Sequence, residues 1–262
     1  MQYKIGFIGA GNMAFALAKA VKKAKLAKSI IVSDPKNERL KYIKKELKID
    51  VTNDNNEVIK KSDVIFLAVK PQVINQVLEE INADDKLIIS IAAGIKLSKL
   101  ESKLKSTRVV RVMPNTPCLV GEMAAGFAIG ERVTDKDIIT VEEILNSAGK
   151  AFYLKESMLD AVTGLSGSGP AFVARLIEAF VEAGRKQGLG KDVANELAIQ
   201  TFLGTAKLLQ ETGMTTDELV GMVSSPNGTT VAGRSVLEKS NYKDIIAKTI
   251  EKATKRSKEL AK

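Results

Sequence analysis

A glycine-rich segment near the N-terminus has the residue types and the spacing to bind a dinucleotide. Residues 9–14 read G-A-G-N-M-A, a G-x-G-x-x-A pattern that directly follows a predicted strand at 4–8 and opens a predicted helix. In this context Gly9 allows a tight turn, Gly11 lets the backbone approach a pyrophosphate, and Ala14 permits close packing of the helix on the strand. The N–H groups at the start of the helix would bind the phosphates. The sequence therefore predicts a nicotinamide dinucleotide site here, in preference to a plain glycine turn.

The end of the next predicted strand bears on the choice between NADH and NADPH. Asp34 lies 25 positions beyond Gly9, where an acidic side chain would bind the ribose 2′-hydroxyl of NADH and repel the 2′-phosphate of NADPH. Ser33, Lys36 and Asn37 lie beside it and could receive that phosphate instead. Asp34 could also simply begin a turn before the proline that follows. Both cofactors remain open.

Three further segments follow predicted strands, and ligands of open parallel sheets bind at these carboxyl ends. They read V-K-P at 69–71, S-I-A-A-G at 90–94 and M-P-N-T-P at 113–117. Lys70 could meet a cofactor phosphate or a substrate carboxylate, or it could be a solvated loop lysine. The small residues at 90–94 would let a flat ring lie close, and the polar, proline-rich segment at 113–117 suits a loop that lines a cleft.

Two motifs in the second half are typical of helix starts. Residues 164–171 read G-L-S-G-S-G-P-A and lead into an apolar helix, and residues 225–230 read S-P-N-G-T-T before another helix. The N–H groups and hydroxyls of the second motif could hold an anion such as a carboxylate. Taken alone, each motif is more often a plain helix cap.

The composition excludes several kinds of chemistry. The 262 residues include no histidine, so no imidazole base or ligand is available, and with a single cysteine a zinc site is not expected. The net charge of +9 raises the possibility of nucleic-acid binding. The lysines are, however, spread along the chain. Aromatic residues make up only 5% of the sequence and there is no tryptophan, so a solvated lysine-rich surface is favoured over a platform on which bases stack.

The elements that must position these motifs fall into two halves. Strand and helix patterns alternate up to about residue 157, with strands expected at 4–8, 29–33, 49–52, 63–69, 86–91, 107–113, 124–129 and 151–154 and helices at 12–23, 37–47, 72–81, 97–104 and 135–148. Such alternation predicts an α/β fold with a doubly wound parallel sheet. After residue 157 the pattern is helical only, at 172–187, 192–212, 216–223, 230–239 and 243–260. We expect two domains, 1–157 and 158–262.

The helices of the second half have unusually wide apolar faces. Examples are F-V-A-R-L-I-E-A-F-V-E at 172–182 and L-A-I-Q-T-F-L-G-T-A-K-L-L at 197–209. A helical segment of this size has a limited core of its own, so we expect these faces to pack against a second copy of the chain, although an ordinary helical core is the simpler alternative.

The expected location is the cytoplasm. The sequence contains no run of about 18 apolar residues, so no membrane-spanning segment is expected. The N-terminal residues lead straight into a strand and lack the features of a signal peptide. The single cysteine, Cys118, can form no internal disulfide, which fits a reducing compartment.

Six motifs occur together in a fixed order, and that order is specific. The sequence G-x-G-N-M-A, V-K-P, S-I-A-A-G, M-P-N-T-P, S-G-S-G-P-A and S-P-x-G-T-T resembles the pyrroline-5-carboxylate reductase family over residues 3–260. The resemblance implies an N-terminal Rossmann-type domain followed by an all-helical domain for substrate binding and dimerisation, with assembly into homodimers or rings of dimers. It also implies NADPH- or NADH-dependent reduction of 1-pyrroline-5-carboxylate to L-proline, the last step of proline biosynthesis.

Site residues follow from the motifs and the resemblance together. The expected cofactor contacts are Gly9, Gly11, Asn12, Met13, Ser33, Asp34, Lys36, Ala68, Val69, Lys70, Pro71, Ala92, Ala93, Gly94 and Asn115. The expected substrate contacts are Ser225, Asn227, Gly228, Thr229, Thr230, Asn115 and Ser168. The chain departs from the family pattern at Asn227, where the family often has a second glycine, but asparagine tolerates the left-handed conformation better than most residues. Cys118 is interpreted as a small apolar residue.

The expected mechanism is hydride transfer from the nicotinamide to the imine carbon. If the imine binds already protonated, no strong acid is needed, which suits a chain without histidine. The resemblance makes Thr230, or a water that it orients, the candidate hydrogen-bond donor to the ring nitrogen, and positioning of the two reactants would be the main task of the protein.

Other functions remain as alternatives. A hydroxyacid dehydrogenase of similar design would need a lysine and an asparagine where this chain has Val173 and Leu176, which argues against that class. A reductase of a neighbouring imine is harder to separate. A nucleotide-binding redox sensor would bind the cofactor without turnover, and a basic nucleic-acid-binding protein would show salt-sensitive binding to DNA.

Overall fold

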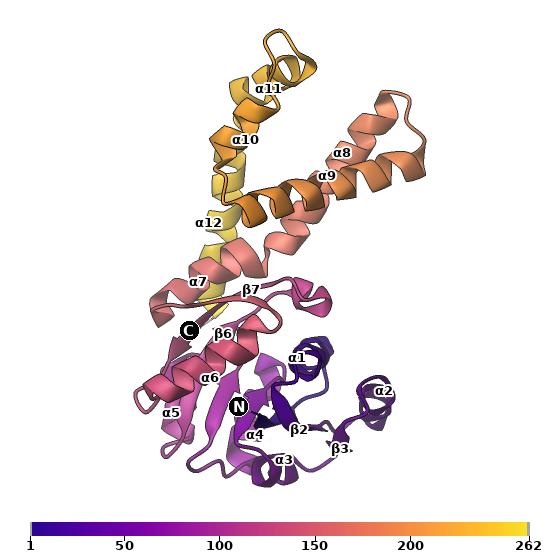
Figure 1. Ribbon diagram of the computed structural model, residues 1–262. Coiled ribbons are helices and arrows are strands. Elements are labelled where there is room, and N and C mark those ends of the chain that lie inside the picture. Colours follow the sequence, from indigo (N-terminus) through magenta and orange to yellow (C-terminus); the bar gives the residue numbers. More distant parts are fainter. Residues whose placement is uncertain (1, 261–262) are drawn as a thin grey trace. The chain divides into compact units, whose positions relative to one another are not determined.

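The computed structural model describes residues 2–260, and these form two units (Figure 1). The sheet unit comprises Met1–Ser168 and Glu251–Lys262, and the helical unit comprises Gly169–Ile250. The division therefore differs from the single expected boundary near residue 157. Residues 158–168 belong with the sheet, and so do residues 251–260, because the last helix returns to this unit. The assignment of 158–262 to substrate binding and dimerisation stays a prediction.

The sheet unit contains one eight-stranded sheet with the order β3-β2-β1-β4-β5-β6-β7-β8. The strands are β1 (Tyr3–Ile8), β2 (Ala27–Ser33), β3 (Asp50–Thr52), β4 (Val64–Leu67), β5 (Leu87–Ser90), β6 (Arg108–Met113), β7 (Met123–Ile129) and β8 (Gly149–Tyr153). The first six strands follow the order of a doubly wound dinucleotide-binding sheet, which confirms the predicted fold class.

The expectation of a wholly parallel sheet is wrong at one place. β7 runs antiparallel to β6, whereas β8 is parallel to β7. The segment between β6 and β7 holds only a short 3-10 turn, η2 (Thr116–Val120), and no crossover helix. A parallel pair needs a crossover of about a dozen residues or more, so this short connection returns the chain in the opposite direction.

Helices cover both faces of the sheet and bury an apolar cluster on each (Figure 1). One cluster takes Phe7 from β1, and the other takes the next residue, Ile8, because successive strand side chains point to opposite faces. The first face carries α1 (Asn12–Lys23), α2 (Asn37–Leu47) and α6 (Asp135–Asn146), and the second carries α3 (Asn55–Lys61), α4 (Ile74–Glu80) and α5 (Leu97–Lys103). The sheet is thus the middle of three layers.

The sheet unit ends with several short turns of helix. After β8 come η3 (Glu156–Met158), α7 (Leu159–Val162) and a π-helical turn, η4 (Thr163–Gly167). The final part of the long helix α12 (Tyr242–Leu260) also belongs to this unit. It is fastened there by the Ser257 hydroxyl, which donates a 2.6 Å hydrogen bond to the Asp160 carboxylate.

The helical unit contains α8 (Gly169–Lys186), α9 (Lys191–Thr212), α10 (Thr216–Met222), α11 (Thr229–Lys239) and the start of α12. α8 and α9 pack together, with the rings of Phe180 and Phe202 edge to face at 5.0 Å. Of the described residues in this unit, only Ala194 and Ala198 are buried. Large apolar side chains are exposed on every helix, among them Val173, Leu176, Phe180, Val193, Leu197, Leu203, Met222, Val236 and Ile245. The unit thus has almost no core within a single copy of the chain.

Among residues 2–260, no helix is long and apolar enough to cross a bilayer.

Candidate active site

The turn after β1 has the backbone shape that its glycines predict. Gly9 has φ +103°, and a Cβ atom built there would lie 2.6 Å from the carbonyl oxygen of Ala68, which follows β4. Only glycine fits this close contact between two strand-end loops. A Cβ built on Gly11 would meet no atom within 4 Å, so the space beside this part of the turn is open.

The helix that follows the turn is free to receive an anion. Gly11 is the N-cap of α1 and offers no capping side chain, while Ala14 is fully buried against the sheet. N–H groups of the first helical turn have no partner within their own helix, and they carry the positive end of its dipole. An open cradle of this kind fits a pyrophosphate, so the structure suits the dinucleotide that the motif predicts.

Asp34 braces the same turn. One carboxylate oxygen accepts a hydrogen bond from the Ala10 N–H at 2.8 Å, and the other accepts from the Lys36 N–H at 2.9 Å. Asp34 therefore shapes the turn at the end of β2, which is one of the two alternatives considered for it, and it also lies against the glycine-rich turn. Whether it contacts a cofactor ribose stays a prediction.

Arg39 is a cation beside the turn that the sequence analysis missed. From the first turn of α2, its Nε donates to the Ala10 carbonyl oxygen at 2.9 Å, and its Nη2 donates to Oδ1 of Asn12 at 3.2 Å. Its guanidinium also lies 5.5 Å from the centre of the Tyr42 ring. An arginine near the end of the second strand is one way in which such folds accommodate a 2′-phosphate. A basic residue in the first turn of the helix after β2 was the available signal.

Ser33 and Lys36 occupy different environments. Lys36 is exposed at the start of α2, where a cofactor phosphate could reach it. The Ser33 side chain is fully buried, and its hydroxyl donates a 2.6 Å hydrogen bond to the Asn55 side chain. The expectation that Ser33 binds the cofactor gains no support from this position, because its hydroxyl is covered on all sides.

The strand-end segments lie along one edge of the sheet. β2, β1, β4, β5 and β6 are consecutive and parallel, so their carboxyl ends share that edge. The edge carries Asp34 after β2, the glycine-rich turn after β1, residues 68–71 after β4 and residues 92–94 after β5. Apart from the buried Ser33, the expected cofactor residues of the sheet unit thus form a continuous strip that crosses the β1–β4 switch point, where such sheets bind nucleotides.

Asn115, at the β6 end of this strip, has a structural task. It is buried, its Nδ2 donates to the Ser166 carbonyl oxygen at 3.1 Å, and its Oδ1 accepts from the Ala124 N–H at 2.9 Å. These bonds tie the loop after β6 to β7 and to the π-helical turn. Its direct contact with cofactor or substrate stays a prediction.

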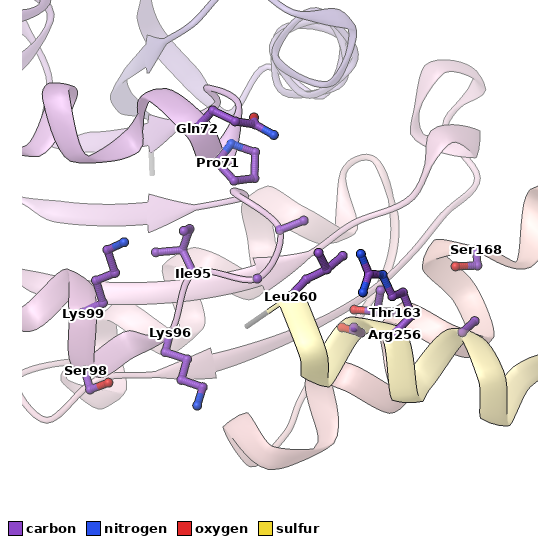
Figure 2. A pocket seen from close by; sticks show the side chains of 14 residues that line it. Pro71, Gln72, Ile95, Lys96, Ser98, Lys99, Thr163, Ser168, Arg256 and Leu260 are labelled. Atoms are coloured by element: carbon purple, nitrogen blue, oxygen red, sulfur yellow. The ribbon is translucent and has the colours of Figure 1, made fainter. Parts of the chain in front are cut away.

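A cavity of about 800 Å³ lies at the β4 and β5 end of the strip (Figure 2). Four of the expected site residues line it, namely Pro71, Ala93, Gly94 and Ser168. It is also lined by Thr163 of the π-helical turn and Arg256 of α12, neither of which the sequence analysis had singled out. Figure 2 shows Arg256 and Leu260 on the last turns of α12, next to the loop that carries Ile95.

The expected substrate-binding turn lies in the helical unit and has a type II shape. The Gly228 N–H donates to the Ser225 carbonyl oxygen at 3.0 Å, and Asn227 adopts the left-handed conformation with φ 57°. Proline followed by a left-handed residue is typical of this turn, so asparagine preserves the shape at the point where the chain departs from the family pattern. Thr229 and Thr230 follow in the first turn of α11 and are exposed.

Cys118 is buried in the core cluster that also contains the apolar side chains of α1, as expected of a small apolar residue. Burial raises the pKa of its thiol from an ordinary value of 9.0 to about 11. A thiolate is therefore not available for chemistry near neutral pH.

Two family models match separate parts of the chain. Residues 156–260 match the model described as pyrroline-5-carboxylate reductase dimerisation, and residues 4–94 match that of NADP oxidoreductases, coenzyme F420-dependent. The pyrroline-5-carboxylate reductase of Methanosarcina acetivorans is 44% identical, with 99% of this chain and 98% of that protein aligned. That of Synechocystis is 39% identical over the whole of both chains.

Solved structures give the same result. A pyrroline-5-carboxylate reductase from Coxiella burnetii superposes with a TM-score of 0.96 at 34% identity, covering both chains completely. A pyrroline carboxylate reductase from Plasmodium falciparum, solved with NADP bound, has a TM-score of 0.85 at 33% identity and covers 99% of this chain and 98% of its own. The chain described here belongs to the pyrroline-5-carboxylate reductase family.

Proposed function

We propose that this protein reduces 1-pyrroline-5-carboxylate to L-proline with NADPH or NADH, the last step of proline biosynthesis. The observation that carries the proposal is the continuous strip from Asp34 to Gly94, with an open phosphate cradle at one end and the 800 Å³ cavity at the other. Family membership supplies the identity of the substrate, and the strip supplies a place for the cofactor that its reduction requires.

The residues of the strip would hold and orient the cofactor. The open space beside Gly11 and the uncapped start of α1 suit the pyrophosphate, and the small residues Ala93 and Gly94 leave room beside a flat ring. When bound, the reduced nicotinamide supplies the hydride that the imine carbon accepts. What remains for the protein is to hold the two reacting carbons about 3–3.5 Å apart and to keep them in line.

The turn at 225–230 would bind the substrate. α11 is eleven residues long and its N-cap, Gly228, offers no side-chain cap, so the N–H groups of its first turn suit the substrate carboxylate. The Thr230 hydroxyl would donate a hydrogen bond to the ring nitrogen, directly or through a water. A protonated imine needs no further acid, which agrees with a chain that has no histidine.

We further propose that the working form is a homodimer, which could assemble into a ring of dimers. The helical unit buries almost nothing by itself and exposes large apolar side chains on each of its helices. A second copy packed against these helices would cover them. The match of residues 156–260 to a dimerisation family supports this arrangement.

The test follows the absorbance of NADPH and, separately, of NADH in the presence of 1-pyrroline-5-carboxylate, with proline identified as the product. Oxidation of either cofactor with formation of proline is the expected result. Binding of the cofactor by thermal shift without any turnover would reject the substrate and leave another imine, or a nucleotide sensor, as the function.

A further inference from the structure

Glu156 joins three elements of the sheet unit through a single carboxylate oxygen. This oxygen, Oε1, accepts a 2.8 Å hydrogen bond from Nη1 of Arg111 on β6 and another of 2.8 Å from the backbone N–H of Leu97, the first residue of α5. Glu156 itself begins η3, just after β8. α5 has no capping side chain of its own, because the cap residue Lys96 makes no such bond. A residue 59 positions away therefore caps this helix.

The Arg111 guanidinium gives Glu156 a fixed place. Only 8% of the Arg111 side chain is exposed, and the strand register sets it between Ser90 of β5 and Ala128 of β7. A buried guanidinium must keep its counter-charge, since an unpaired charge in the interior is strongly destabilising. Glu156 is thus held over the carboxyl end of β5, where it reaches the start of α5.

Between Ser90 and Leu97 runs the loop at 91–96, and four of its residues line the 800 Å³ cavity. At its entry, the Ile91 N–H donates to the Leu67 carbonyl oxygen at 3.1 Å. Inside it, Gly94 has φ 76° and the Ile95 N–H donates to the Ala92 carbonyl oxygen at 3.4 Å, which is a long bond. At its exit, the contact from Leu97 to Glu156 is a charge-assisted bond and therefore the stronger anchor.

We propose that Glu156, held by Arg111, is a positioning residue that fixes the loop at 91–96 beside the reacting end of the cofactor. The inference rests on the proposed function, in which Ala93 and Gly94 lie next to the nicotinamide. Glu156 touches neither cofactor nor substrate in this role. It determines where the loop stands, and a displacement of about 1 Å in such a site can cost on the order of a hundredfold in rate.

Two double variants separate the anchor from the ion pair. Both carry Arg111→Met, so neither holds an unpaired guanidinium. Glu156→Gln added to it keeps an oxygen for the Leu97 N–H, whereas Glu156→Leu offers no acceptor at all. We expect the Gln version to keep most of its kcat and the Leu version to lose on the order of ten- to a hundredfold. The Kd for NADPH should change little in both, because the glycine-rich turn binds the pyrophosphate. Equal kcat values for the two versions, whether high or low, would overturn the proposal.

A second pair of variants removes the donor and serves even if the Leu version does not fold. Leu97→Pro lacks the N–H, and proline is tolerated at the first position of a helix, while Lys96, with φ −77° and ψ 153°, suits the residue before a proline. Leu97→Ala loses a similar amount of side chain and keeps the N–H. The expected result is a kcat at least about tenfold lower for the Pro variant than for the Ala variant. Matching kcat values would reject the anchor.

Amide hydrogen exchange at Ile95 tests the same anchor without any turnover. It should be faster in the Glu156→Leu double variant and in Leu97→Pro than in their matched controls. If the unaltered protein fails to reduce the imine, that failure counts against the proposed function only, and the exchange rates still decide whether Glu156 holds the loop. Unchanged exchange in both pairs would show that it does not.

Discussion

The backbone N–H of Ala10, in the centre of the glycine-rich turn, donates a 2.8 Å hydrogen bond to the carboxylate of Asp34. This contact sets a negative charge beside the expected position of the cofactor's adenosine ribose. We predict that Asp34→Ser lowers the KM for NADPH relative to that for NADH by about tenfold, because a 2′-phosphate is no longer repelled and a 2′-hydroxyl loses an acceptor worth about 1.5–3 kcal/mol. Steady-state kinetics with both cofactors give the ratio, and an unchanged ratio would mean that Asp34 only shapes the turn.

Arg39 should favour the binding of NADPH, the cofactor that Asp34 is expected to disfavour. Its guanidinium is held against the turn by the bonds to Ala10 and Asn12 and is only partly exposed. Removing this charge by Arg39→Leu should raise the KM for NADPH by about tenfold and the KM for NADH much less, since a charged hydrogen bond contributes about 1.5–3 kcal/mol. Arg175→Leu is the matched control, because Arg175 pairs with Glu178 on an exposed face of α8. Equal effects on both cofactors would assign Arg39 to the turn alone.

Thr230 tests the substrate end of the site. If its hydroxyl donates to the ring nitrogen, Thr230→Ala should lower kcat/KM by on the order of tenfold to a hundredfold, and Thr230→Ser should retain much more activity. Both variants keep the backbone N–H groups at the start of α11, so the carboxylate site is preserved. Unchanged turnover in the Ala variant would remove the role assigned to this residue.

The positive φ of Asn227 gives a prediction about stability. Asn227→Ala should lower the free energy of unfolding by about 1 kcal/mol, because alanine bears the full steric cost of the left-handed region, whereas Asn227→Gly should be close to neutral. Urea denaturation of the two variants beside the unaltered protein measures the difference. Ala and Gly variants of equal stability would show that the turn relaxes to another conformation.

The sequence pattern located those helices whose apolar residues recur at regular helical spacing. α1 and α2 were predicted at 12–23 and 37–47, the bounds that the structure gives, because their apolar residues recur at helical intervals. α3 was missed, since it has seven residues and buries only Val58 and Ile59. The reversed direction of β7 was also missed, because alternation of strand and helix signals does not record which way a strand runs.

The site residues also differ in how far the sequence could reveal them. Gly9 could be found because its close contact with the Ala68 carbonyl oxygen and its φ of +103° leave glycine as the one residue that fits. For Arg39 the sequence offered only its position in the first turn of the helix after β2, and for Glu156 it offered nothing, because their partners lie 27 to 59 positions away and depend on strand order. In the sequence each looks like an ordinary charged residue at the start of a helix. Ser33 looked available as the last residue of β2, but its side chain is buried and bonded to that of Asn55.

Cys118 makes the pH dependence of stability testable. Burial raises the pKa of its thiol from 9.0 to about 11, so between these values the unfolded chain ionises while the folded protein keeps the proton. The unfolded state then binds fewer protons, and the contribution to stability, complete below pH 9, is lost as the pH rises toward 11. We predict that Cys118→Ala removes this part of the decline in urea-unfolding free energy between pH 8.5 and about 11. A thiol reagent at pH 8 should label the unaltered protein only in denaturant, and rapid labelling of the folded protein would contradict the burial that raises this pKa.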